Sequence, residues 1–127
     1  MISLDTNTVL RFLLEDVPEQ AKRVAELIEK DNVYITDVVA TETIFVLEKV
    51  MRLKRQDIFD LVTDFLEQPN VIYNRYFLME TISLYKARSS LSFVDCYAAI
   101  EAKTYGNSLV TFDKELAKRG GNHVKEL

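Results

Sequence analysis

The sequence predicts an α/β protein with a mostly parallel sheet and helices on both of its faces. Short apolar runs typical of buried strands alternate with longer segments in which apolar residues recur at helical spacing. This alternation favours parallel strands joined by helical crossovers. The chain has 127 residues and no low-complexity stretch, linker or internal repeat, so we expect one domain over residues 1–127.

The composition restricts the class of protein further. Hydrophobic residues make up 48% of the chain and charged residues 28%, as in a compact, helix-rich protein. The net charge of −4 argues against a protein that coats nucleic acid generally, although one local cleft could still bind it. A single cysteine, no apolar run of ~20 residues and no signal-like N-terminus favour a cytoplasmic protein that does not enter a membrane.

The first half of the chain contains three strand candidates separated by helices. Pro18 stands at a favoured first-turn position of one helix, and Asp37 is expected to cap another that runs to about Arg52. The expected strands are residues 2–4, 33–35 and 71–73, and the expected helices cover residues 9–14, 18–28, 37–52 and 56–67.

The second half predicts two longer helices, a strand, a short helix and a terminal edge strand. Gly106 is expected to end the second of the longer helices, because glycine adopts the left-handed conformation that follows many helices. The expected helices are residues 78–87, 93–105 and 114–118, and the strands are residues 109–112 and a segment at Val124.

Four acidic residues are poorly explained as ordinary solvated surface. Asp5 and Asp113 each follow a strand-like run, so we expect both at the sheet edge where α/β proteins bind ligands. Glu42 has only apolar residues three and four positions away on its helix, which predicts a carboxylate on an apolar face that needs a partner. If these acids converge with Asp95, a divalent cation held by oxygen ligands would balance their charges.

Each acid also has a purely structural interpretation. Asp5 and Asp113 could cap the helices that follow them, and Asp95 completes a capping-box pattern that begins at Ser92. Glu42 could form a buried ion pair with a basic residue. A capping carboxylate can also bind a metal ion, so the structural and catalytic interpretations are compatible.

Three other features carry weaker functional signals. Cys96 could be a nucleophile, but His123 is far away in the sequence and no triad pattern is present, so a buried core cysteine is favoured. His123 itself lies among glycines and is expected in an exposed loop. A basic run is expected to be a solvated helix end, with phosphate contact as the alternative: Lys49, Arg52, Lys54 and Arg55.

Four features, in order along nearly the whole chain, together resemble the PIN-domain family. They are Met1-Ile2-Ser3-Leu4-Asp5-Thr6-Asn7, the mid-helix Glu42, Phe93-Val94-Asp95-Cys96-Tyr97-Ala98-Ala99, and Leu109-Val110-Thr111-Phe112-Asp113. Within that family, the length of the chain and its lack of extra domains most resemble the VapC-type toxins of toxin-antitoxin modules.

The resemblance implies a three-layer α/β/α sandwich and a Mg²⁺- or Mn²⁺-dependent endoribonuclease, which is a hydrolase. The implied catalytic and metal-binding acids are Asp5, Glu42, Asp95 and Asp113, with Asp113 the least constrained because the last acid varies most in such proteins. Supporting polar residues are implied at Thr6 or Asn7 and at Thr111. The implied partners are an RNA substrate, a cognate antitoxin and a second copy of the chain in a homodimer.

The chemistry of RNA cleavage agrees with these residue types. Hydrolysis of a phosphodiester needs a nucleophile at neutral pH and stabilisation of charge on the phosphate oxygens, and a bound cation supplies both. A catalytic histidine is then not required, which suits a chain with one histidine.

Two other classes of protein stay open from the sequence. Asp5-Thr6-Asn7-Thr8-Val9 loosely matches the nucleophile loop of haloacid-dehalogenase-like phosphatases, although Asn7 replaces the general acid and the chain is short for that fold. An inert PIN-like binding module, whose acidic pocket only receives a basic residue of a partner, is the second alternative.

Overall fold

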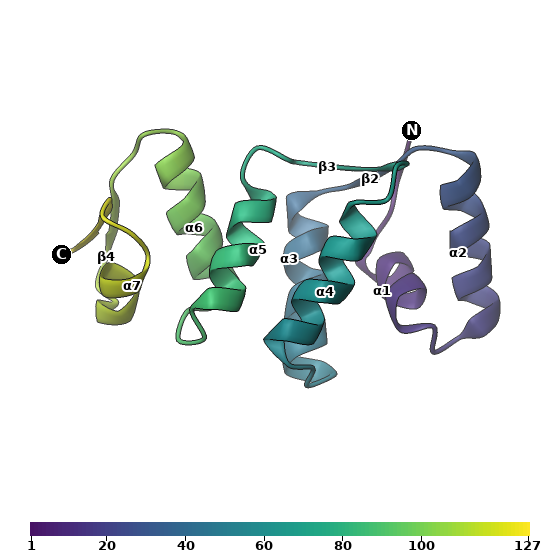
Figure 1. The fold of residues 1–127 in the computed structure, drawn as a ribbon, viewed down its shortest axis with the longest axis horizontal. Helices are drawn as coiled ribbons and strands as arrows, with labels where there is room; N and C mark the ends of the chain where they lie inside the picture. Colours follow the sequence, from purple (N-terminus) through teal and green to yellow (C-terminus); the bar gives the residue numbers. More distant parts are fainter. The chain divides into compact units, whose positions relative to one another are not determined.

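The computed structural model of the protein describes residues 1–127. The chain divides into two compact units, residues 1–74 and residues 75–127. Figure 1 shows the helices and strands of both. Strands and helices alternate along each unit, as the sequence predicts.

The first unit contains a three-stranded sheet in the order β1-β2-β3. Its strands are Ile2–Ser3, Val33–Ile35 and Val71–Tyr73. All pairings are parallel: Ile2 lies opposite Val33, and Val33 lies opposite Val71. Parallel neighbours cannot be joined by a tight turn, so helices connect them. The three predicted strands and their parallel arrangement are confirmed in this unit.

Four α-helices and one short π-helix make the connections of the first unit. They are α1 (Thr6–Leu14), α2 (Pro18–Lys30), α3 (Asp37–Phe45), the π-helix η1 (Val46–Val50) and α4 (Arg55–Leu66). Pro18 occupies the first position of α2, as predicted. The helix predicted to reach Arg52 ends at Val50, and Arg52 has a φ of 57°, outside the right-handed helical region.

The predicted cap at Asp37 is wrong by one residue. The hydroxyl of Thr36 accepts a hydrogen bond from the Val39 amide at 3.1 Å, so Thr36 is the N-cap of α3. Asp37 is the first helical residue, and its Oδ2 accepts a hydrogen bond from the Asn74 side chain at 3.1 Å. Both residues suit an N-cap by chemistry, so only the backbone conformation distinguishes them.

One face of α3 and η1 lies in the core of the first unit. Ala40, Thr43, Ile44 and Leu47 follow the i, i+3, i+4, i+7 spacing of a helix stripe, and none is more than 4% exposed. The sheet contributes its alternate side chains to this core: Val33, Ile35, Val71 and Tyr73.

The second unit contains a two-stranded parallel sheet and three helices. The helices are α5 (Leu78–Ala87), α6 (Phe93–Thr104) and α7 (Lys114–Arg119), and the strands are β4 (Leu109–Thr111) and β5 (Val124–Glu126). Leu109 pairs with Val124, which confirms the terminal edge strand. Gly106 has a φ of 73° directly after α6, and this left-handed conformation ends the helix as predicted.

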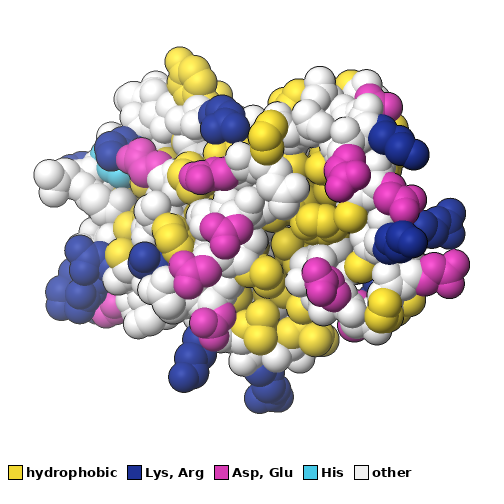
Figure 2. Space-filling view, turned by 45° about the vertical axis from the view of Figure 1, so that its right-hand side comes forward, with side chains coloured by type: hydrophobic (Ala, Val, Ile, Leu, Met, Phe, Trp, Pro, Cys, Tyr) yellow, Lys and Arg dark blue, Asp and Glu magenta, His cyan; other side chains and the backbone are white.

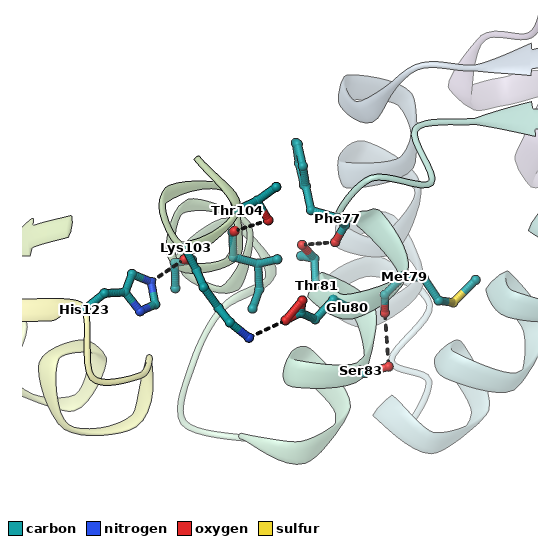
Figure 3. A network of polar contacts seen from close by, with 10 residues as sticks. Phe77, Met79, Glu80, Thr81, Ser83, Lys103, Thr104 and His123 are labelled. Carbon is teal, nitrogen blue, oxygen red and sulfur yellow. Dashed lines mark hydrogen bonds and ion pairs between the residues drawn. The ribbon is translucent and has the colours of Figure 1, made fainter. Parts of the chain in front are cut away.

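Aromatic and polar contacts fix the helices of the second unit. The rings of Tyr85 and Phe93 meet edge to face with centroids 5.6 Å apart, which ties α5 to the start of α6. Figure 3 shows Lys103 of α6 reaching Glu80 of α5, with Nζ and Oε1 2.6 Å apart. Cys96 of α6 is fully buried, which confirms its assignment to the core.

The prediction that His123 is exposed is wrong. Its ring is half-buried, and Nε2 lies 2.6 Å from the carbonyl oxygen of Ala99 in α6. In Figure 3 the ring points toward this helix. The turn before β5 therefore uses the histidine as a structural contact to α6.

None of the helices combines the length and the apolar character that crossing a bilayer requires.

Candidate active site

Asp5 comes two residues after the carboxyl end of β1 and is the N-cap of α1. Its Oδ1 accepts hydrogen bonds from the Thr8 hydroxyl at 2.7 Å and from the Thr8 amide at 2.8 Å. These bonds, the hydroxyl first and then the amide, lower the pKa of the Asp5 carboxyl below its usual value. Asp5 is exposed, and both bonds use the same oxygen, so Oδ2 is the oxygen best placed to reach a ligand.

Asp113 has the same position at the end of β4 and begins α7. Its Oδ1 accepts from the amides of Glu115 and Leu116 at 2.8 and 3.1 Å, which confirms the predicted cap. The hydroxyl of Thr111 accepts a hydrogen bond from the Asp113 amide at 2.9 Å. Thr111 therefore holds the backbone that carries the acid.

Asp95 lies in the first turn of α6 and completes a capping box. The Ser92 hydroxyl accepts from the Asp95 amide at 3.1 Å, and the Asp95 carboxylate accepts from the Ser92 amide at 3.4 Å. The second bond is long, so it constrains the carboxylate weakly. Asp95 is half-buried, and its side chain keeps access to solvent.

Glu42 is not buried, which contradicts the expectation from its apolar neighbours. Its side chain is exposed on α3, and Val38 and Phe45 on the same face are 77% and 58% exposed. The opposite stripe of the helix, which contains Ala40 and Ile44, faces the core instead. A partner that compensates a buried charge is therefore not needed, and the interpretation of Glu42 as a buried ion pair is wrong.

The four acids are divided between the units, with Asp5 and Glu42 in the first and Asp95 and Asp113 in the second. Within either unit, no group of three or more His, Cys, Asp or Glu side chains could hold a metal ion. The donor chemistry nevertheless fits Mg²⁺, which is commonly bound by one or two carboxylates, several waters and substrate phosphates. Convergence of all four acids stays a prediction.

The basic run from η1 to the first residue of α4 divides into two kinds of residue. Lys49, Arg52 and Lys54 are exposed, whereas Arg55 is half-buried and donates from Nε to Glu48 Oε2 at 3.1 Å. Arg55 therefore has a structural role in its own unit. On the face drawn in Figure 2, basic and acidic side chains are interspersed, so charge alone does not mark one nucleic-acid surface there.

A groove between α1 and α2 adjoins Asp5, and the sequence did not predict it. It has a volume of about 560 Å³ and contains Asn7 together with Asp5. Thr6 is half-buried in the first turn of the same helix. The signal that could have found the groove is the i, i+3, i+4, i+7 stripe on α2, formed by Gln20, Arg23, Val24 and Leu27.

Two more polar residues follow the other strands of the first sheet. Asp37 comes two residues after β2 and Asn74 directly after β3, and their side chains are hydrogen bonded to each other. Together with Asp5 they place polar side chains after all three parallel strands, at the edge where such sheets bind ligands. The pattern of an apolar triplet followed by a polar residue, Val71-Ile72-Tyr73-Asn74, could have identified Asn74.

The chain belongs to the PIN domain family, whose match covers residues 2–122 and spans both units. The three-layer α/β/α fold predicted from the sequence is the fold of this family. The resemblance stated from the motifs is thereby confirmed.

Among curated proteins, the chain is similar to a VapC ribonuclease from Aquifex aeolicus (strain VF5). The two sequences are 27% identical over 126 residues, an alignment that covers 92% of this chain and 90% of the relative. The similarity therefore extends over nearly the full length of both proteins.

Proposed function

We propose that the protein is a metal-dependent endoribonuclease of the VapC type, which hydrolyses RNA phosphodiester bonds as the toxin of a toxin-antitoxin module. The observation that carries this proposal is the similarity to a VapC ribonuclease over 92% of the chain, within a PIN domain match to residues 2–122. The exposed carboxylate of Asp5 at the carboxyl end of β1 supports it, because ligands bind at that edge of parallel sheets.

Asp5, Glu42, Asp95 and Asp113 are the residues that we propose hold Mg²⁺ or Mn²⁺. When bound, the cation would acidify a water molecule and polarise the scissile phosphate. Asp5 is well suited to this role because the hydrogen bonds from Thr8 fix the orientation of its carboxylate. Asn7 and Thr6 would contact substrate or water near Asp5, and Thr111 positions Asp113 through the backbone.

This arrangement requires the two units to act as one PIN domain over residues 1–127. Each unit supplies two of the four acids, and the family match spans the boundary between the units. The domain is therefore proposed to be catalytically complete only when both units are present.

The experiment that tests the proposal is incubation of the purified protein with labelled RNA in Mn²⁺, in Mg²⁺ and in EDTA. We expect internal cleavage with either metal ion and none in EDTA. Cleavage that persists in EDTA would contradict metal dependence, and intact RNA under all three conditions would contradict the ribonuclease activity.

Membership of the PIN family removes the basis of the phosphatase alternative. The other alternative, an inert PIN-like binding module, predicts that the RNA stays intact in Mn²⁺, in Mg²⁺ and in EDTA.

The proposed regulation is by an antitoxin in the cytoplasm, with the toxin as a homodimer. The antitoxin would place an Arg or Lys against Asp5 and Asp95, where charge-assisted hydrogen bonds compete with the cation. Co-purification with a small protein encoded beside this one, followed by a cleavage assay of the complex, tests that role. A complex as active as the free protein would contradict it. Sedimentation analysis of the free protein tests the dimer.

A further inference from the structure

One face of α3 is exposed and continues through η1 toward the turn before α4. It is formed by residues three or four positions apart, and we call it the α3–η1 face: Val38, Glu42, Phe45 and Lys49. Phe45 is 58% exposed, although phenylalanine is among the residues most often buried. Because Glu42 is a proposed metal-binding acid, the face leads from the proposed active site to the turn at residues 51–54.

Three cations at the end of this face are free of ion pairs. Residues 49–55 contain four basic residues and no acid, in a chain whose net charge is −4. Arg55 is paired with Glu48, whereas Lys49, Arg52 and Lys54 are exposed and take part in no ion pair. The charge of these three side chains is therefore available to phosphate groups.

Arg52 has a backbone conformation that usually selects glycine or asparagine. Its φ is 57°, and the amide of the next residue, Leu53, donates to the Leu47 carbonyl at 3.0 Å where η1 ends. Residues with a side-chain Cβ are strained in this left-handed region, so glycine or asparagine would suit the turn better. Strained residues are frequent at functional sites, where the side chain is needed for a ligand.

The α3–η1 face and the turn after it offer the two kinds of contact that single-stranded RNA uses. An exposed phenyl ring can stack on a nucleobase, and unpaired Lys and Arg side chains contact phosphates. Phe45 lies about one helical turn from Glu42 on one side and from Lys49 on the other. The aromatic contact is therefore placed between the proposed active site and the cations.

A second copy of the chain fits this surface less well than RNA does. The turn and η1 bring three unpaired cations, and the face supplies one acid, Glu42, so two copies packed through it would leave like charges together. An acidic protein segment would satisfy the cations. RNA is favoured over such a segment because it is the polyanion that the proposed activity brings to Glu42.

We propose that the α3–η1 face and the turn after it bind the single-stranded RNA segment next to the bond that is cleaved, with Phe45 stacking on a base and Lys49, Arg52 and Lys54 contacting phosphates. The proposal rests on the proposed ribonuclease function and adds where its substrate lies.

The charge contacts are tested by the binding of a labelled single-stranded RNA oligonucleotide of mixed sequence in EDTA, where metal-dependent cleavage cannot occur. Lys49→Gln, Arg52→Asn and Lys54→Gln are compared with Lys22→Gln, which removes the same charge from an exposed position of α2. We expect each of the three to weaken binding about fivefold and to flatten the salt dependence by about 0.7 of a log–log unit. Lys22→Gln should leave the affinity within about twofold.

Arg52→Asn separates RNA binding from folding. Asparagine tolerates the left-handed conformation, so the melting temperature of this variant should equal or exceed that of the wild type while its RNA binding falls. A loss of binding that accompanies a lower melting temperature would make Arg52 a structural residue and would contradict its assigned phosphate contact.

The stacking contact is tested at Phe45. Phe45→Leu keeps an apolar side chain but removes the ring, so it should weaken binding about fivefold or more with the salt dependence unchanged. Phe45→Tyr keeps a ring and should bind within about twofold of the wild type. Equal affinity of the leucine variant and the wild type would exclude stacking at this position.

Hydrogen exchange of the wild type gives a result that does not depend on any variant. RNA should slow amide exchange in residues 45–55. Absence of that protection, equal losses in the Lys22 variant and the turn variants, or no RNA binding by the wild type would overturn the proposal. Variants that lose antitoxin binding or change the oligomeric state, with RNA binding intact, would also overturn it and would assign the surface to an acidic protein segment or to a second copy.

The outcomes separate this inference from the proposed function. If the wild type cleaves RNA and the variants at the four positions bind and cleave as well as it does, the ribonuclease stands and the surface proposal fails. If the wild type binds RNA through Phe45 and the three cations but cleaves nothing with Mn²⁺, the surface proposal stands and the ribonuclease fails.

Discussion

The two units of the chain contain the same strand-to-helix junction in two versions. In each, a short parallel strand is followed by an aspartate that caps the next helix, Asp5 in the first unit and Asp113 in the second. Asp5 is held by one residue, Thr8, through both hydroxyl and amide, and it adjoins a groove. Asp113 is held by two backbone amides at the start of a six-residue helix. The two versions therefore differ in what holds the carboxylate: the hydroxyl and amide of one residue in the first unit, and two backbone amides in the second.

Replacement of the proposed metal-binding aspartates is expected to have the largest effect, and it tests whether Asp5 and Asp113 differ in their importance for cleavage. We expect Asp5→Asn and Asp95→Asn each to reduce RNA cleavage by roughly 100-fold or more, because an amide is a poor ligand for a hard cation. Asp113→Asn is expected to have a smaller effect. Asparagine caps helices as well as aspartate, so the melting temperatures should stay close to that of the wild type. A fully active Asp5→Asn protein would remove the site assignment.

Glu42→Gln tests the one proposed metal-binding acid that does not cap a helix. Because Glu42 is exposed, its replacement should change the free energy of unfolding by no more than about 0.5 kcal/mol. We expect RNA cleavage to fall by roughly 10- to 100-fold, as for residues that support a bound metal. A large loss of stability with normal activity would instead give Glu42 a structural partner. Urea unfolding and the cleavage assay measure the two effects separately.

Asp113→Ala tests the structural side of the comparison. The two backbone amides of Glu115 and Leu116 would lose their acceptor, and loss of such a cap costs about 1 kcal/mol. Asp113→Asn is the matched control, because it retains a capping oxygen. Equal stability of the alanine and asparagine variants, measured by urea unfolding, would show that the cap contributes nothing to the second unit.

A buried threonine in each unit gives a second matched pair. Thr81 of α5 is fully buried and donates from its hydroxyl to the Phe77 carbonyl at 2.9 Å, as Figure 3 shows. Thr43 of α3 is 2% exposed, and its Oγ1 has no hydrogen-bond partner.

Replacement by valine, which has the same shape, should therefore act differently at the two sites. Thr81→Val should cost about 1 kcal/mol of unfolding free energy, whereas Thr43→Val should be neutral or slightly stabilising. Denaturant midpoints of the two variants measure the difference. A cost at Thr43 equal to that at Thr81 would reveal a bound water or partner at its hydroxyl.

The smallest effect that we expect is the contribution of the Asp5 cap to the pH dependence of folding stability. Hydrogen bonds from Thr8 lower the pKa of Asp5, so its charged form stabilises the folded state above the unfolded pKa of about 3.9. That stabilisation is lost as the pH falls through the lowered folded pKa. Thr8→Val should raise the Asp5 pKa toward its usual value, as followed by NMR of the carboxyl carbon. Thr8→Ser keeps both donors and should leave the pKa unchanged.

Local sequence patterns predicted most of the fold. The five strands, the capping roles of Asp5 and Asp113 and the capping box at Ser92 and Asp95 are present with boundaries within a few residues. The caps depend on residues no more than four positions apart, so their interacting groups lie together in the sequence. The cap at Thr36 was missed because Asp37 has equivalent chemistry one position later.

The sequence by itself determined the order of strands and helices, the acids that begin helices and the family to which the chain belongs. Only the tertiary structure decided which face of α3 is buried, because both of its faces are apolar and packing alone selects Ala40 and Ile44 over Val38 and Phe45. It also paired Arg55 with Glu48 and formed the groove beside Asp5. Such features join residues from different helices or distant turns, and helical periodicity cannot specify which apolar or charged stripe meets which neighbour.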